Sequence, residues 1–294
     1  MKAAASYPAN LRLQSRARMP RQFLVLTLAL ACASSYSLPL RAQGTVDSSA
    51  RLPGIAISID AAAAPLNHVL PATKTKAPAA SPVIVIGFLG GRVKKGNAIH
   101  REVQLAEQLR KQYPTGVYIG IFANSHGQRA FRQILKLLDT NHNGSLSTAE
   151  KQRARIILYG HSWGASETVI LTHWLDHEGI PVQLAILVDR VPKFGSGDET
   201  IPPNVAQAVN FYQLDGLLHG LSTIRAADPA DTRILGNYQF NYKDKHVDCT
   251  HFPWYARLFM GPHIEIENDP RVWNQVESLI AAKLPPESPV IASN

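Results

Sequence analysis

The residues of this sequence that are best suited to catalysis surround one serine. Gly160-His161-Ser162-Trp163-Gly164 matches G-x-S-x-G, a sharp turn that lifts a nucleophilic serine out of the end of a strand. The two glycines have a steric reason, because a strand that reverses abruptly into a helix leaves no room for side chains beside the turn. A serine hydroxyl needs an imidazole to take its proton and a carboxylate to orient that imidazole. The pattern therefore predicts nucleophilic catalysis by Ser162, and the chain must supply the other two groups.

The segments around the motif must hold the serine in place. Residues 155 to 160 contain the apolar run Ile156-Ile157-Leu158, which is typical of a strand covered on both faces. Residues 165 to 178 have apolar side chains at helical spacing, and Gly179 follows as a stop signal. We therefore expect the nucleophile to stand between a buried strand and a helix.

The base must be chosen by position, because the sequence contains 11 histidines. In the protein family in which this motif is typical, the three groups follow in the chain order Ser, acid, His. His263 lies just before the last amphipathic segment, and we expect it in a loop there that returns to the carboxyl edge of the sheet. His251 and His246, both ahead of Trp254, are the alternatives.

Two aspartates can supply the acid. Asp189 ends the apolar strand candidate 182 to 188, and Asp215 follows the candidate 209 to 213. Both would project at the carboxyl edge, where ligands bind in open α/β sheets. Asp215 precedes Gly216 and also fits a turn, so we favour Asp189.

An oxyanion hole requires two backbone N–H groups aimed at the developing charge. Trp163, the residue after the nucleophile, is one candidate. The glycine-rich stretch 87 to 92 follows the first strong strand candidate, and from it we favour Leu89, with Gly90 as its neighbour. The sequence predicts that Leu89 and Trp163 receive the oxyanion.

Strand and helix patterns alternate from about residue 81 onward. Strand candidates lie at 82 to 87, 117 to 122, 155 to 160, 182 to 188, 209 to 213 and 232 to 236. Asn97 is a candidate cap for the first helix, the pattern around Phe131 predicts another, and Asp269-Pro270 opens the last. This alternation favours a mostly parallel sheet with helices on both faces.

With serine, strand-end aspartate, late histidine and glycine loop in this order, residues 81 to 284 resemble the α/β-hydrolase superfamily, and most of all its secreted bacterial esterases, lipases and thioesterase-like members. The resemblance implies a single domain with the α/β-hydrolase fold and hydrolysis through an acyl-enzyme. It assigns Ser162 as nucleophile and His263 as base. Two features depart from it: the oxyanion loop lacks the His-Gly pair of many members, and Asp189 comes one strand early.

A second motif points to a metal. Residues 139 to 150 match the twelve-residue EF-hand loop D-x-[DN]-x-[DN]-G-x₅-E, and Gly144 allows its sharp turn. Calcium binds six to eight oxygens, for which the loop offers Asp139, Asn141, Asn143, Ser145, Ser147 and Glu150. With two charged ligands and one loop, we expect a structural ion with Kd on the order of 10⁻⁴ to 10⁻³ M and no cofactor for the catalysis. The alternative is a polar turn in which Ser147 and Glu150 form a capping box.

The amino-terminal region predicts export. Residues 1 to 42 have a basic start, a short apolar run at 23 to 33 and a small-residue exit, which together are typical of a secretory signal cleaved after Ala42. An uncleaved anchor and a lipid-modified Cys32 are alternatives. Residues 43 to 80 form an Ala/Pro-rich linker with a candidate edge strand at 54 to 59, and residues 285 to 294 form a tail. Removing Cys32 leaves Cys249 without a partner for an internal disulfide.

Charge gives no reason to expect nucleic acid. The net charge is +8, but residues 1 to 42 carry six basic and no acidic residues, so the remainder carries +2. We therefore predict a secreted or periplasmic serine hydrolase acting on a small-molecule or lipid ester. A non-catalytic calcium-binding protein on the same scaffold is the alternative, and amide bonds are a further substrate option for the same residues.

Overall fold

The computed structural model describes residues 83–91, 97–193 and 200–286. The predicted signal segment, the linker with its candidate strand at 54 to 59, and all but the first two residues of the predicted tail lie outside the described residues.

Within the described residues, a six-stranded sheet has the order β2-β1-β3-β4-β6-β8, and every neighbouring pair is parallel. Its strands are β1 (Val83–Leu89), β2 (Val117–Ala123), β3 (Arg155–His161), β4 (Leu184–Val188), β6 (Gln207–Tyr212) and β8 (Arg233–Gln239). A separate parallel pair joins β5 (Thr200–Ile201) to β7 (Arg225–Ala226).

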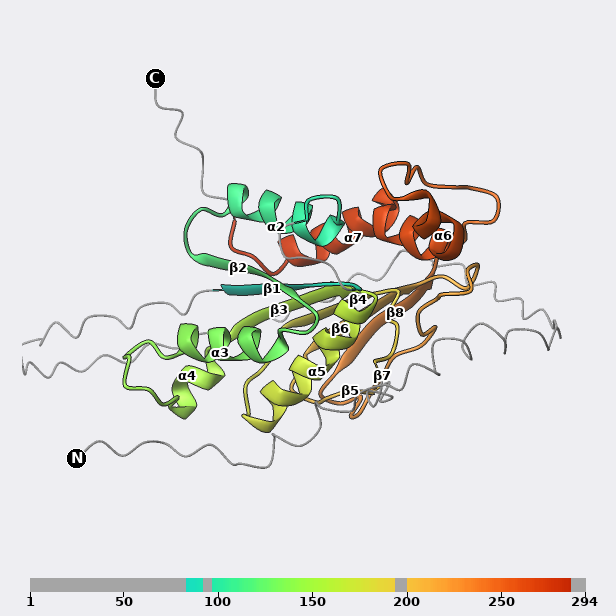
Figure 1. The fold of residues 1–294 in the computed structure, drawn as a ribbon. Coiled ribbons are helices and arrows are strands. Elements are labelled where there is room, and N and C mark those ends of the chain that lie inside the picture. Colours follow the sequence, from blue (N-terminus) through green and yellow to red (C-terminus); the bar gives the residue numbers. More distant parts are fainter. Residues whose placement is uncertain (1–82, 92–96, 194–199, 287–294) are drawn as a thin grey trace, which may run out of the picture. The chain divides into compact units, whose positions relative to one another are not determined.

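Helices cover both faces of the large sheet (Figure 1). One side carries α2 (Arg101–Gln112), α6 (Trp254–Asn268) and α7 (Pro270–Ala281); the other carries α3 (Gly127–Leu138), α4 (Thr148–Gln152) and α5 (Trp163–His177). Alternate strand residues divide between the two cores: Ile157 packs with the α2 and α7 side, and Ile156 and Leu158 with the α3 and α5 side. The predicted α/β fold with a parallel sheet covered on both faces is confirmed.

The first helix begins later than predicted. Asn97 does not cap it; α2 starts at Arg101, with His100 as its cap residue. The Asn97 side-chain oxygen accepts the Ile99 N–H at 3.4 Å, and its carbonyl accepts the His100 N–H at 3.2 Å, so Asn97 closes a separate turn ahead of the helix. The last helix begins at Pro270 as predicted, where the Asp269 side chain accepts the Arg271 N–H.

Strand register brings the chemistry to one edge. His161, the last residue of β3, lies beside Val188, the last residue of β4. Ser162 and Asp189 each follow one residue later, and the Ser162 N–H donates to the Val188 carbonyl at 2.9 Å. Parallel pairing therefore places the two side chains at the same carboxyl edge of the sheet.

Candidate active site

Ser162 sits on a strained turn between β3 and α5. Its backbone has φ 57° and ψ −124°, a conformation that costs on the order of 1–3 kcal/mol and persists only where the surrounding structure enforces it. The flanking glycines make it possible: a Cβ on Gly160 would lie 2.5 Å from the Gly164 carbonyl carbon, and one on Gly164 would lie 2.2 Å from the Phe88 carbonyl oxygen. The steric reason inferred from the motif therefore applies at both glycines.

The structure brings Ser162, His263 and Asp189 together. Ser162 Oγ lies 2.9 Å from His263 Nε2, and His263 Nδ1 lies 2.6 Å from Asp189 Oδ2. The three residues expose 6%, 5% and 0% of their surface, respectively. Both ring nitrogens are thus engaged, one by the hydroxyl and the other by the carboxylate. An imidazole held in this way can take the serine proton on one side while the carboxylate stabilises the resulting positive charge.

Asp189 is fixed by its own hydrogen bonds. Its Oδ1 accepts the Gly220 N–H at 2.7 Å, and its Oδ2 accepts the Gln213 amide at 2.8 Å. The backbone at Asp189 has φ 43°, so the chain turns sharply as it leaves β4. Asp215, the alternative acid, instead accepts the Tyr242 N–H at 2.7 Å. The structure therefore places Asp189, and not Asp215, beside the imidazole.

His263 lies inside a helix, so the prediction of a loop was wrong. Helix α6 spans Trp254–Asn268 and has a kink with non-helical angles at Met260, followed by Pro262. Proline is accepted at the first turn of a helix, so the second half of α6 starts afresh and carries His263 in its first turn.

The alternative histidines contact other groups. His246 Nδ1 lies 2.9 Å from Glu265 Oε1, and His251 Nε2 lies 3.2 Å from Asn268 Oδ1. Neither is hydrogen-bonded to Ser162.

A parallel sheet, a serine on a strained strand-to-helix turn, an acid after the next strand and a late histidine now stand together. The chain has an α/β-hydrolase fold. No protein-family model and no curated protein matches the sequence.

Solved structures similar to this α/β-hydrolase fold include a novel cutinase-like protein from Cryptococcus sp., at 16% identity, with 70% of this chain and 97% of that chain covered and a TM-score of 0.34. RedJ, with a polyethylene glycol molecule bound in its active site, matches at 10% identity, 75% and 96% coverage, and a TM-score of 0.35. The NocB thioesterase domain, in covalent complex with a fluorophosphonate nocardicin G analogue, matches at 12% identity, 70% and 96% coverage, and a TM-score of 0.33.

The predicted oxyanion residues lie next to the serine turn. Trp163 is the first residue of α5, and the first N–H groups of a helix have no intrahelical acceptor. Leu89 ends β1, and its carbonyl accepts the Asn124 side-chain amide at 3.0 Å. The N–H of Gly90, the alternative, donates to Glu102 Oε1 at 3.3 Å. The oxyanion pair Leu89 and Trp163 stays a prediction.

A buried polar cluster behind His263 was missed by the sequence analysis. Glu267 Oε1 lies 2.5 Å from His100 Nδ1, and Glu267 Oε2 lies 3.5 Å from His161 Nδ1. Glu102 is fully buried and also belongs to the cluster. Burial raises the pKa of Glu267 to about 8, and burial together with the Glu267 charge raises the pKa of Glu102 to about 8. One signal was available: Glu267 follows His263 by four residues, which places both on one face of a helix.

The raised pKa values of Glu102 and Glu267 predict that the free energy of unfolding depends on pH. In the unfolded chain both carboxyls ionise near pH 4.5, whereas the folded chain keeps protons up to about pH 8. Below pH 6.5 the lowered pKa values of His100 and His161 oppose this effect, because the unfolded chain then binds protons that these two buried rings do not. Above pH 6.5 the native state binds more protons than the unfolded chain, so the free energy of unfolding should fall as pH rises from 6.5 to 8. The slope is at most about 1.4 kcal/mol per pH unit for each retained proton.

Urea unfolding between pH 6.5 and 8 measures this slope. Glu267→Gln should flatten it, and Glu265→Gln, two residues away on α6, should not. Equal slopes in wild type and Glu267→Gln would contradict the assignment of a retained proton to the pair.

The predicted calcium loop forms a tight turn. Asp139 Oδ2 accepts the Gly144 N–H at 2.9 Å, and Asn143 Oδ1 accepts the Ser145 N–H at 2.9 Å. Gly144 has φ 82°, as the sharp turn requires. The side-chain oxygens of Asp139, Asn141 and Asn143 thus all face the inside of the loop through bonds to its own N–H groups. This set of hard oxygen donors fits calcium chemistry.

Glu150, the closing residue of the loop, also forms the capping box of the alternative interpretation. Its Oε2 accepts the Ser147 N–H at 3.0 Å, and its own N–H donates to Ser147 Oγ at 3.3 Å. Its Oε1 accepts the Thr140 N–H at 3.0 Å, which ties the two ends of the loop. Hydrogen bonds from Ser147, and then from Thr140, lower the pKa of Glu150 to about 2, so this carboxylate is charged at neutral pH.

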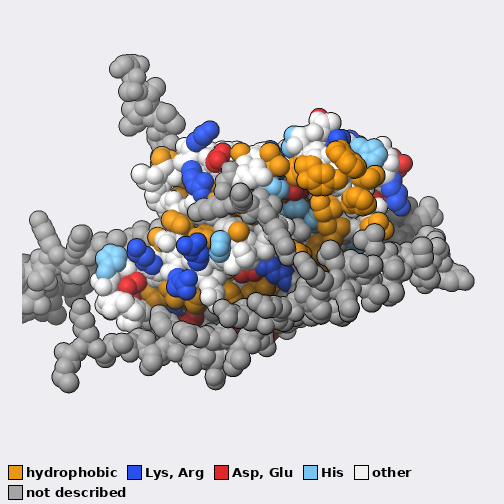
Figure 2. Space-filling view, in the orientation of Figure 1, with side chains coloured by type: hydrophobic (Ala, Val, Ile, Leu, Met, Phe, Trp, Pro, Cys, Tyr) orange, Lys and Arg blue, Asp and Glu red, His pale blue; other side chains and the backbone are white. Residues whose placement is uncertain are grey.

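The aromatic residues considered for a pocket lie in different places. Phe88 is fully buried, whereas Trp163 is 37% exposed, and Trp254 and Tyr255 are exposed on α6. Figure 2 shows the apolar patch over α6, to which Leu258 and Phe259 also contribute exposed side chains. Of these four aromatic residues, only Phe88 is therefore part of the buried core.

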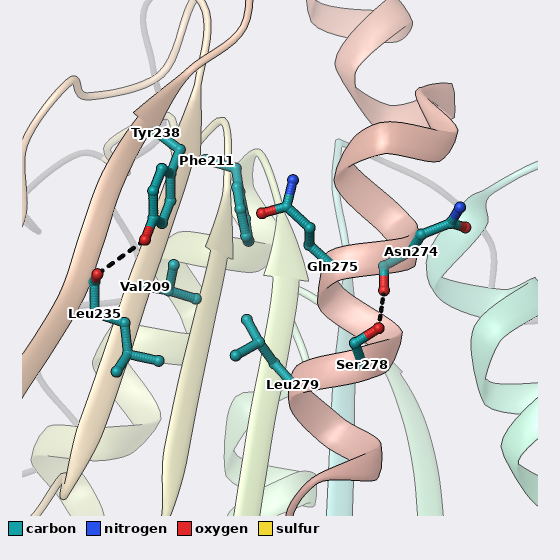
Figure 3. A pocket seen from close by; sticks show the side chains of 8 residues that line it. All are labelled: Val209, Phe211, Leu235, Tyr238, Asn274, Gln275, Ser278 and Leu279. Carbon is teal, nitrogen blue, oxygen red and sulfur yellow. Dashed lines mark hydrogen bonds between the residues drawn. The ribbon is translucent and has the colours of Figure 1, made fainter. Parts of the chain in front are cut away.

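A cavity of about 330 Å³ lies between the β6–β8 side of the sheet and α7 (Figure 3). Its lining consists of Val209, Phe211, Leu235, Tyr238, Asn274, Gln275, Ser278 and Leu279. The two hydroxyls in this lining donate to backbone carbonyls, Tyr238 to Leu235 and Ser278 to Asn274. The cavity shares no residue with the serine site.

Cys249 is buried and free, and burial raises the pKa of its thiol to about 12. Among the described residues, no helix has the length and apolar character needed to span a membrane.

Proposed function

We propose that the protein is a serine hydrolase that cleaves a small-molecule or lipid ester or a thioester through an acyl-enzyme. The observation that carries this proposal is the continuous chain of contacts from Ser162 Oγ to His263 Nε2, at 2.9 Å, and from His263 Nδ1 to Asp189 Oδ2, at 2.6 Å. A buried histidine that satisfies both nitrogens in this order has the geometry of a general base aimed at a nucleophile.

In the acylation half of the reaction, His263 Nε2 takes the hydroxyl proton as Ser162 Oγ attacks the carbonyl carbon. The carbonyl oxygen becomes an oxyanion, which the N–H groups of Leu89 and Trp163 receive. Collapse breaks the bond to the alcohol or thiol, which leaves with the proton from His263. Asp189 stays ionised and holds the imidazolium.

In the deacylation half, a water molecule takes the place of the departed alcohol or thiol. His263 accepts one of its protons as the water oxygen attacks the acyl carbon. Collapse returns that proton to Ser162 Oγ and releases the carboxylic acid. An amide substrate would pass through the same steps, but its nitrogen must be protonated as it leaves, so the ester and amide options differ in the leaving group.

A fluorophosphonate probe tests the proposal directly, because it phosphonylates only an activated serine. Wild-type protein should be labelled, and peptide mass spectrometry should place the label on Ser162. Hydrolysis of p-nitrophenyl esters of increasing acyl length should accompany the labelling and report the acyl preference. Folded protein that neither takes the label nor cleaves any ester would leave the alternative, a non-catalytic calcium-binding protein on a hydrolase scaffold.

For the loop at 139 to 150 we propose weak binding of a structural calcium ion by Asp139, Asn141, Asn143, Ser145 and Glu150. The inward-facing oxygens and the turn at Gly144 support this proposal. The loop joins α3 to α4, directly ahead of the nucleophile strand β3, so an ion would stiffen the connection into the strand that carries Ser162.

Calcium should raise the melting temperature. With Kd of about 1 mM, calcium at about 10 mM stabilises the folded state by about 1.4 kcal/mol. Differential scanning calorimetry with calcium and with chelator measures the shift. Asp139→Ala should abolish it, whereas Asp176→Ala, on α5 and outside the loop, should retain it. The same melting temperature with and without calcium would favour the capping-box interpretation.

We also propose that residues 1 to 42 direct export to the periplasm or outside the cell. The basic start and short apolar run support this. Amino-terminal sequencing of the exported protein should begin at Gln43. A chain that starts at a lipid-modified Cys32, or one that retains the segment in the membrane fraction, would replace this proposal with one of the two anchored forms.

A further inference from the structure

The hydrogen bonds of His263 leave the faces of its ring to be held by other means. Its two nitrogens are engaged by Ser162 and Asp189, and both bonds lie near the plane of the ring. Because misalignment weakens a hydrogen bond, packing on the ring faces adds to what holds the ring in that plane. The ring of His161 covers one of them, with 4.5 Å between ring centroids and 35° between ring planes.

His161 is suited to packing by its face. It is 3% exposed, and its Nε2 is buried with no hydrogen-bond partner among the described residues. Burial and the neighbouring His263 lower the pKa of His161 well below its usual value, so the ring is neutral and adds no charge beside the base. A Cβ on Gly90 would lie 3.3 Å from His161 Nδ1, which shows how closely the chain packs on this side of the ring.

Glu267 contacts both His161 and His100. It follows His263 by one turn of α6, and its Oε2 lies 3.5 Å from His161 Nδ1. Its Oε1 lies 2.5 Å from His100 Nδ1, which ties α6 to the residue before α2. Neighbouring ligands on a metal with bonds of 2.0–2.1 Å stand roughly 3 Å or more apart. The 2.5 Å between Glu267 Oε1 and His100 Nδ1 therefore has the length of a hydrogen bond and is shorter than the spacing of two ligands on one ion.

We propose that His161 and Glu267 are positioning residues for the base: the His161 ring packs against the His263 ring, and Glu267 contacts His161 and, through His100, fixes the helix that carries His263. This inference rests on the proposed function, since it takes His263 as the general base. Neither residue contacts the bond that is broken. A small misplacement of the base can still cost about 10²-fold in rate, so the effect should appear in kcat.

Two substitutions of His161 distinguish the contribution of its flat ring from that of its ring nitrogens. His161→Phe keeps a flat ring and loses the nitrogens, whereas His161→Asn keeps a polar group and loses the ring face. We expect His161→Phe to stay within about fivefold of the wild-type kcat, and His161→Asn to lose about 10- to 100-fold with KM within about twofold. The reverse order, or wild-type kcat in both variants, would overturn the proposal.

Glu267→Gln tests the second residue, and Glu265→Gln on the same helix is its control. We expect Glu267→Gln to lower kcat by about tenfold with KM unchanged, and Glu265→Gln to keep the wild-type kcat. If Glu267→Gln kept it as well, the role of Glu267 would be refuted. Metal analysis of the dialysed protein adds an independent check, because a stoichiometric metal lost in Glu267→Gln would show a metal site instead.

A proton resonance reports the position of the base without a turnover assay. The proton between His263 Nδ1 and Asp189 Oδ2 should give a downfield signal in the wild type, and the signal should shift or broaden in His161→Asn and remain in His161→Phe. This measurement also applies if Glu267→Gln fails to fold. Wild-type protein that takes no fluorophosphonate label would refute the proposed function, whereas labelled wild type with unaffected variants would refute only this inference.

Discussion

Ser162→Ala is expected to lower kcat for ester hydrolysis by about 10⁴- to 10⁶-fold, the range found when a serine nucleophile is removed from an intact site. The loss should be this large because the hydroxyl forms the covalent bond, and the groups left behind can only bind and polarise the ester. Steady-state hydrolysis of a p-nitrophenyl ester, together with loss of fluorophosphonate labelling, measures the effect.

Ser166→Ala is the matched control. Ser166 lies one turn further along α5, is fully buried, and donates its hydroxyl proton to the Val191 carbonyl at 2.6 Å. Its removal should cost stability of about 1 kcal/mol and leave kcat within a few-fold of wild type. If Ser162→Ala retained more than about one hundredth of the wild-type rate, another nucleophile would have to carry the reaction.

Local pattern explains why most of the site could be predicted. The strand Ile156-Ile157-Leu158 and the glycines around Ser162 act within a dozen residues, so the turn is visible in the sequence alone. Asp189 could be preferred because a carboxylate at the end of a buried strand needs a reason to be there, and parallel pairing then carries it to the same edge as the serine.

What could not be predicted depends on contacts between distant segments. His100 and Glu267 are 167 positions apart, and a glutamate on an amphipathic helix has the appearance of a solvated residue until the fold buries it. The helical placement of His263 was missed for a related reason. The loop was expected because His263 precedes the last amphipathic segment, but the kink at Met260 lets Pro262 stand in the first turn of a new helical segment.

The second large effect concerns the acid. Asp189→Asn is expected to lower kcat by about 10⁴-fold with little change in KM, because an amide does not stabilise the imidazolium and favours the wrong tautomer of His263. Asp215→Asn should stay within a few-fold of wild type, since Asp215 accepts the Tyr242 N–H and does not contact the imidazole. Both aspartates follow strand candidates and carry the same carboxylate, so the two substitutions test the geometry and not the residue type.

Stability must be separated from catalysis in this comparison. Asp189 Oδ1 accepts the Gly220 N–H, and its Oδ2 accepts the Gln213 amide. Asparagine can replace only one of these acceptors, so Asp189→Asn should also unfold more easily, by about 1–3 kcal/mol. Rates should therefore be measured well below the melting temperature of each variant, with fluorophosphonate labelling of Ser162 as the readout of nucleophile activation. A rate for Asp189→Asn within tenfold of wild type, or a larger loss in Asp215→Asn, would mean that the carboxylate 2.6 Å from His263 Nδ1 is not the one that supports the base.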